Sequence, residues 1–156
     1  MAEETQAPTD TDPQFRVQKI YVKDVSFETP NSPQVFMTDW EPEIDFNLGS
    51  NAQQIQENTF EVTLKVTVTV TLGQKTAYLI EVSQAGIFGA LGFGADELGH
   101  LLGSYCPSIL FPYAREAVSD LVIKGGFPPM LLAPVNFDGL YAQRLEELSV
   151  GSQTSH

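Results

Sequence analysis

The stretch FEVTLKVTVTVTL, residues 60–72, restricts the fold most strongly, because its residues alternate strictly between apolar and polar. The apolar positions are Phe60, Val62, Leu64, Val66, Val68, Val70 and Leu72. Successive side chains of a strand point to opposite faces, so a period of two predicts a strand with one buried and one solvated face. A helix would repeat every 3.6 residues instead. The chain is therefore expected to build a sheet that is covered on one side only.

Three further strands are predicted around this one. FRVQKIYVKDVSFE, residues 15–28, forms the first, and 35–48 the second, with Pro42 marking a bulge, an edge or a break. Gly73-Gln74 is a hairpin signal that returns the chain as a fourth strand over 75–84, antiparallel to the third. The polar stretch 49–58, GSNAQQIQEN, is expected to be a loop.

Alternation also predicts which residues share a face in these strands. Asp24 and Glu28 fall on one face of the first strand. Leu79 and Glu81 fall on one face of the fourth strand, and its opposite face carries Ile80, Val82 and Gln84. Acidic residues on a sheet face are most often a solvated surface, and that ordinary interpretation stays open.

The glycine-rich stretch AGIFGALGFG, residues 85–94, is expected to form a flexible apolar loop. Such a loop either offers a contact surface or packs on the core or an oligomer interface. It has neither the GK[ST] nor the GxGxxG spacing of a phosphate-binding loop, so no nucleotide site is predicted.

The pattern changes to helical from Asp96 onward. Pro107 is expected to end or kink this helix, and Pro112 to begin another that stops at Gly125-Gly126. Asn136 is a suitable N-cap for a last helix over 137–148. Strands followed by helices indicate an α+β fold, a four-stranded antiparallel sheet followed by helices packed on one face.

The 156 residues suit a single domain over 15–148, with disordered tails at 1–14, which is acidic, and 149–156. The first residues lack the apolar segment of a signal peptide, and no run approaches the roughly 18 apolar residues of a membrane span. We therefore expect a cytoplasmic protein without direct membrane insertion. A formal net charge of −12 would repel phosphate backbones, so nucleic acid is not an expected partner.

Cys106 and His100 are the only candidates for nucleophilic chemistry that the sequence offers. They are six residues apart in a predicted helix and so lie on roughly opposite sides of it, which argues against a Cys-His pair. One cysteine, two histidines and no carboxylate cluster at ligand spacing predict no metal site. The sequence therefore indicates a protein that is not an enzyme and needs no cofactor.

Four segments resemble the bacterial SecB export-chaperone family and occur in that family's order: IYVKDVSFETPNSP (20–33), AGIFG (85–89), CPSILFPYARE (106–116) and LAPVNFD (132–138). The resemblance implies an ATP-independent holdase that keeps unfolded precursor proteins competent for translocation and delivers them to the SecA ATPase. It also implies a homotetramer, a dimer of dimers with helices between two outer sheets. A dedicated antitoxin-associated chaperone of the same fold is the alternative.

Three sets of site residues follow from this resemblance by position. The SecA-binding patch corresponds to Asp24, Glu28, Leu79 and Glu81. Positions that support tetramer assembly correspond to Ile80, Val82 and Gln84. For the apolar client-binding groove we expect Trp40, Ile44, Phe46, Leu48, Ile87 and Phe88. Where relatives often carry further cysteines, this chain has Ile80 and Leu101, which weakens any thiol role.

Overall fold

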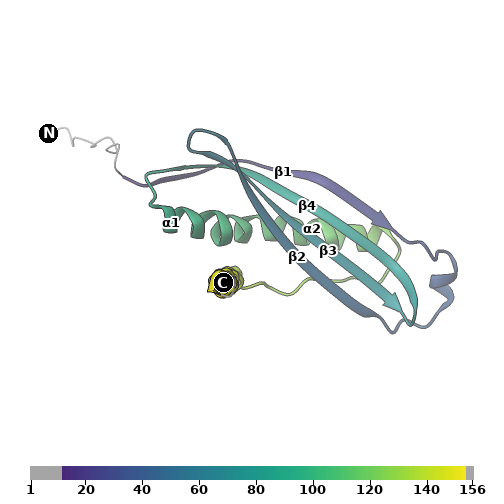
Figure 1. Cartoon of the computed structure of the whole chain (residues 1–156). Helices are drawn as coiled ribbons and strands as arrows, with labels where there is room; N and C mark the ends of the chain where they lie inside the picture. Colours follow the sequence, from purple (N-terminus) through teal and green to yellow (C-terminus); the bar gives the residue numbers. More distant parts are fainter. Residues whose placement is uncertain (1–11, 154–156) are drawn as a thin grey trace.

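A computed structural model describes residues 12–153 (Figure 1). The elements along the chain are β1 (Gln14–Glu28), the 3₁₀ turn η1 (Gln34–Met37), β2 (Glu43–Gln56), β3 (Thr59–Leu72), β4 (Lys75–Leu91), α1 (Ala95–His100), the π-helical turn η2 (Leu101–Tyr105), α2 (Cys106–Lys124) and α3 (Phe137–Gln153). Disordered tails were expected over 1–14 and 149–156; residues 1–11 and 154–156 lie outside the described residues, whereas Gln14 begins β1 and 149–153 belong to α3.

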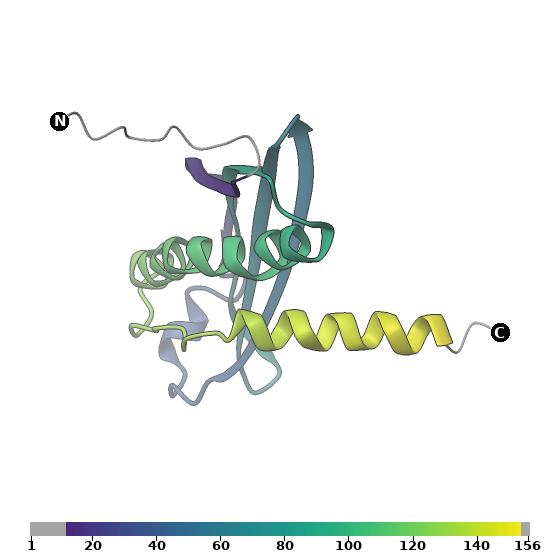
Figure 2. The same ribbon diagram turned by 90° about the vertical axis from the view of Figure 1, so that its left-hand side faces the viewer.

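The four strands form one antiparallel sheet in the order β1-β4-β3-β2, and α2 covers one of its faces (Figures 1 and 2). We call the covered face the inner face and the other the outer face. The alternation in β3 has the predicted effect, since Val62, Val66 and Val68 are fully buried beneath the helix while the threonines between them are half-buried. The expected α+β fold with helices on one face is therefore confirmed.

Two expected loops are strands instead. β2 continues to Gln56 through the polar stretch, and its residues pair with β3 up to the turn, with Asn51 opposite Thr63 and Gln54 opposite Phe60. This extension lies at a solvated sheet edge, where polar side chains need no apolar cover. Polarity alone therefore gave the wrong prediction of a loop.

The glycine-rich stretch is the second corrected loop, because β4 extends to Leu91. Its glycines allow close packing rather than flexibility. The ring of Phe88 folds back over Gly86, where an added Cβ would lie 2.7 Å from Cε2 of that ring. Glycine in a strand commonly marks such a close approach.

β1 contains two register shifts, between Val17 and Lys19 and between Val22 and Asp24. A β-bulge inserts one residue and so exchanges the faces of every residue beyond it. Because there are two bulges, their effects cancel: Phe15 and Phe27 share the inner face, where they stack on Phe88 and Tyr78, and only the residues between the bulges exchange faces.

α1, η2 and α2 form one continuous helical segment, so the expected break at the prolines is wrong. Pro107 has no backbone N–H and would clash with the carbonyl four residues earlier in an α-helix. The preceding turn widens to a π-helix, in which the amide of Cys106 donates to the carbonyl of Leu101. Pro112 stays inside α2 with its ring exposed to solvent.

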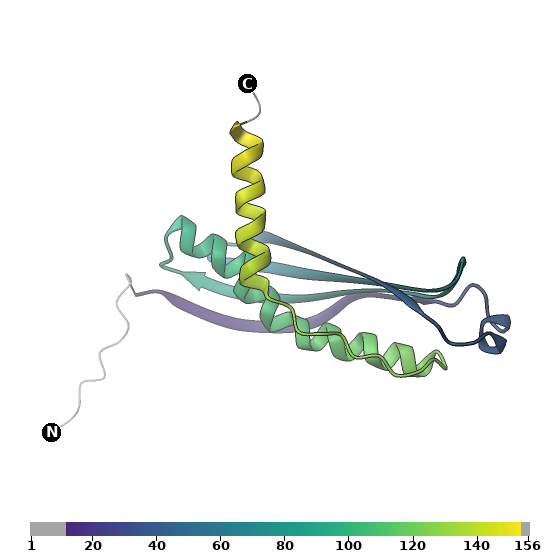
Figure 3. The same cartoon turned by 90° about the horizontal axis from the view of Figure 1, so that it is seen from below.

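Asn136 caps α3 as predicted, since its Oδ1 accepts a hydrogen bond from the amide of Gly139 at 3.1 Å. The helix runs to Gln153, beyond the expected end at residue 148, and projects past the β2 edge of the sheet (Figures 2 and 3). Its first turns rest on η2, where the ring of Tyr141 fills the space left by Gly103 and Ser104 donates to the carboxylate of Asp138.

Candidate functional site

The four residues expected to bind SecA lie together on the outer face. In the register of β1 and β4, Glu28 stands opposite Leu79, and the next positions pair Ser26 with Glu81 and Asp24 with Ser83. Asp24 and Glu28 are exposed, and Leu79 and Glu81 are half-buried. The two strands thus present one surface, which we call the acidic face and define by Asp24, Glu28, Leu79 and Glu81.

A second polar cluster joins β1 to β3 beside the acidic face. The hydroxyl of Tyr21 donates to Glu61, and Nζ of Lys23 lies 2.8 Å from Oε1 of the same carboxylate. The pKa of Tyr21 is raised to about 12. Burial of the side chain is the largest cause, and the hydrogen bond to Glu61 and the negative charge of Glu61 add to it. Hydrogen bonds from Lys23 and Tyr21 lower the pKa of Glu61, so this carboxylate is ionised at neutral pH. No pattern in the sequence predicts this cluster, because Glu61 lies 40 residues from Tyr21 and 38 from Lys23.

The three residues expected at the subunit interface, Ile80, Val82 and Gln84, are buried within this subunit. Ile80 and Val82 are fully buried under α2, and Gln84 is 2% exposed. Nε2 of Gln84 donates to the carbonyl of Tyr21 at 3.0 Å and so ties β4 to β1. Any influence of these residues on assembly would pass through the position of α2 and β1 rather than through direct contact.

The six residues expected in a client groove do not form one surface, and this corrects the expectation of a single groove. Ile87 and Phe88 are neighbours in a strand and point to opposite faces, and Phe88 is fully buried. Phe88 pairs with Phe60, near the β2–β3 turn, whereas Ile44 pairs with Val70 toward the other end of the sheet. Only residues of the β2 side and Trp40 remain candidates for a shared apolar surface.

Five aromatic rings gather where the chain crosses from β1 to β2, at the end of α2. They are Phe27, Phe36, Trp40, Tyr78 and Phe127, and we call them the aromatic end. Phe127 lies at the centre, with ring centroids 4.7 Å from Tyr78, 5.0 Å from Phe36 and 5.7 Å from Trp40.

The outer rings of the aromatic end remain open to solvent. Phe36 is 47% and Trp40 36% exposed, and Met37 beside them is 88% exposed. Ile44, on the inner side of β2, is also more than half exposed. Large apolar side chains exposed in a group indicate a binding surface. The sequence identified Trp40 and Ile44 but missed Phe36 and Phe127, since the contacts that unite them are long-range.

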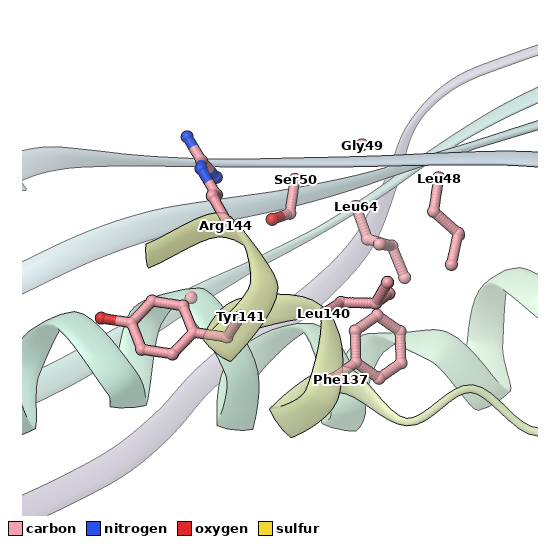
Figure 4. Close-up of a pocket in the computed structure, with 9 residues that line it drawn as sticks. Leu48, Gly49, Ser50, Leu64, Phe137, Leu140, Tyr141 and Arg144 are labelled. Atoms are coloured by element: carbon pink, nitrogen blue, oxygen red, sulfur yellow. The ribbon is translucent and has the colours of Figure 1, made fainter. Parts of the chain in front are cut away.

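A cavity of about 310 Å³ lies between β2 and α3 (Figure 4). Leu48 and Leu64 line it from the sheet, and Phe137, Leu140 and Tyr141 line it from the helix. Figure 4 shows Leu140 and Arg144 extending from α3 toward the strands, while the ring of Tyr141 points aside, over the helical segment. Leu48, one of the expected client-binding residues, therefore borders an apolar opening at the free edge of the sheet.

Cys106 and His100 do not form a catalytic pair. Burial raises the pKa of the Cys106 thiol to about 12. Nε2 of His100 instead lies 2.9 Å from Oδ1 of Asp138. Within residues 12–153 no cluster of three or more His, Cys, Asp or Glu side chains is arranged to hold a metal ion. In the same part of the chain, no helix combines the length and the apolar character that crossing a membrane requires.

The thiol of Cys106 should resist modification in the folded protein. At pH 8 a group with a pKa of about 12 is ionised in only roughly one molecule in 10⁴, and the thiolate is the reactive form. We expect an aromatic disulfide reagent to react with less than a tenth of the protein in an hour, and with one equivalent once guanidinium unfolds it. Rapid reaction in the native state would contradict the burial described here.

Comparison with known proteins agrees with this architecture. The family model described as preprotein translocase subunit SecB matches residues 8–148. The protein-export protein SecB of Methylococcus capsulatus is 67% identical over 146 residues, covering 94% of this chain and 92% of the relative. That of Nitrosococcus oceani is 62% identical over 136 residues, covering 86% and 83%.

A solved structure shares the fold. The SecB-like chaperone of Mycobacterium tuberculosis, in complex with a ChAD peptide from the HigA1 antitoxin, superposes with a TM-score of 0.65. It is 16% identical, with 78% of this chain and 90% of the other covered, so this likeness bears on the fold alone. The family model and the relatives extend across nearly the whole chain. The chain belongs to the SecB family of protein-export chaperones.

Proposed function

We propose that this protein is a cytoplasmic, ATP-independent holdase that binds unfolded precursor proteins and passes them to SecA for export. The observation that carries the proposal is the exposed part of the aromatic end, Phe36, Met37 and Trp40. An extended client would bury its own apolar side chains against these groups, at about 25 cal/mol per Å² of apolar area removed from water. Such contacts need no particular client sequence, which fits a broad range of clients.

The acidic face supports the second part of the proposal. Carboxylates gathered on one side of the sheet attract a basic partner and speed its encounter. The SecA family supplies a basic, zinc-bearing tail, and Asp24, Glu28 and Glu81 would meet its positive charges while Leu79 gives an apolar contact. This surface lies on the outer face, away from α2, so a client at the aromatic end and a tail on the sheet can bind together.

Exposed apolar side chains support assembly into a homotetramer. On α2, Tyr113 is 51% and Ile123 59% exposed, and Val22 on β1 is 51% exposed. A monomer of this size would leave these groups in water, whereas symmetric contacts between copies would cover them. We propose a dimer of dimers in which α2 lies between the sheets.

A refolding assay with several unrelated denatured proteins tests the holdase function. We expect the chaperone to delay refolding of most of them when present in excess, because its contacts are shared by many apolar segments. Delay of one client only would instead favour a dedicated chaperone, the role suggested by the antitoxin peptide bound to the Mycobacterium tuberculosis protein. No delay of any client would contradict both functions.

A further inference from the structure

Strand register divides part of the outer face into three neighbouring rows that run across all four strands. The first row is Asp24–Ser83–Lys65–Gly49, the second Ser26–Glu81–Thr67–Asn47 and the third Glu28–Leu79–Thr69–Asp45. Four carboxylates occur among these residues. Among the residues of the three rows, Lys65 carries the only positive charge.

Lys65 lies beside a carboxylate of the acidic face. Its Nζ lies 3.9 Å from Oε2 of Glu81, and the two side chains are 54% and 38% exposed. Lys23, the nearest lysine along β1, lies 2.8 Å from Glu61 and so is already engaged outside these rows. Lys65 is therefore the cation that a basic partner meets when it approaches Glu81.

The surroundings of Lys65 leave it room to move. A hollow of about 450 Å³ on this face is lined in part by Lys65, Asp24 and Ser83, and Lys23 and Glu61, which pair with each other, also line it. Gly49, next to Lys65 in the first row, contributes no side chain, and a Cβ added there would meet no atom within 4 Å. The lysine can thus leave Glu81 for open space without disturbing the sheet.

We infer that Lys65 is a built-in competitor that holds down the affinity of the acidic face for a basic tail. It neutralises Glu81 in the free protein and repels positive charge arriving at Asp24 and Glu81. This inference rests on the proposed docking of SecA, and it adds that Lys65 limits the affinity of the acidic face for the SecA tail. An attenuated site suits a transfer partner, since a tail that binds too tightly would slow release after each delivery.

The test measures binding of a zinc-loaded peptide with the sequence of the carboxyl-terminal tail of SecA, by calorimetry at low salt. Lys65→Gln removes the competing charge, and we expect its Kd to fall by about three- to fivefold, the range for one exposed charge pair. The gain should shrink at 0.5 M salt, where charges more than a few ångströms apart are screened.

Lys124→Gln is the matched control. Lys124 lies 2.8 Å from Asp120 on α2, so its loss changes the net charge equally but away from the sheet's outer face. The inference requires tighter binding by Lys65→Gln than by Lys124→Gln. Equal affinities of the two variants would overturn it, because the effect would then be one of net charge.

Asp24→Lys separates the failure of this inference from failure of the docking proposal. If the parent binds the peptide and Asp24→Lys does not, docking holds, and the comparison of the two glutamine variants decides the role of Lys65. If the parent does not bind, or Asp24→Lys binds as well as the parent, docking on the acidic face is wrong and the inference falls with it.

Discussion

Replacing Glu81 by lysine is expected to abolish binding of the SecA tail while leaving client capture intact. The substitution removes a carboxylate from the centre of the acidic face and sets a second cation beside Lys65, whose Nζ lies 3.9 Å from the present carboxylate. A positive side chain placed within a few ångströms of a basic ligand weakens binding more than the loss of one favourable charge pair does. We expect affinity to fall by well over tenfold, or more than about 1.4 kcal/mol, so that no binding is detected in the titration. Asp24→Lys should behave in the same way.

Glu57→Lys provides the control for these reversals. Glu57 is exposed in the turn between β2 and β3, at the far end of the sheet from the acidic face, and its reversal changes the net charge equally. Calorimetric titration should show near-parental affinity for this variant. A tail that binds Glu81→Lys as tightly as Glu57→Lys would falsify the assignment of the acidic face.

The double substitution Phe36→Ala with Trp40→Ala is expected to remove most client capture. Phe36 is 47% and Trp40 36% exposed, and both rings rest on Phe127. Losing about 100 Å² of apolar contact area weakens binding by up to about 2.5 kcal/mol for each ring, at about 25 cal/mol per Å². The apparent Kd for an unfolded client should rise more than tenfold, measured by competition between capture and refolding.

The leucines of α3 supply a matched control for this pair. Leu145 and Leu148 are 49% and 63% exposed but lie on the projecting helix rather than at the aromatic end. Leu145→Ala with Leu148→Ala should capture clients almost as well as the parent. Equal losses in both double variants would show that capture depends on general apolar surface. Circular dichroism should first establish that the Phe36 and Trp40 variant retains its secondary structure.

Local periodicity was enough to predict four strands and the faces of the central ones, although the second strand was expected from residue 35 and begins only at Glu43, after the turn η1. β3 alternates so regularly that its buried and half-buried residues could be named in advance. The helix cap at Asn136 could be predicted from that side chain alone. The common face of Asp24 and Glu28 was also predictable, because both lie beyond the second bulge of β1. These features depend on residues close together in the chain.

Features that depend on distant partners could not be predicted in the same way. Gly86 looked like a sign of flexibility, but its meaning depends on the ring of Phe88 folding over it. Pro107 looked like a helix end, but the wider turn before it accommodates the missing amide. The aromatic end and the Tyr21–Glu61–Lys23 cluster arise only when separate segments meet.

Native mass spectrometry, with and without a chemically denatured precursor protein, tests most directly whether this chain is an assembled holdase. We predict a particle of about four times the 17.1 kDa chain mass that gains the mass of one or more unfolded client chains and gains nothing from the same client when folded. A particle that stays at the single-chain mass and binds no unfolded client, or one that binds folded and unfolded clients equally, would contradict the account.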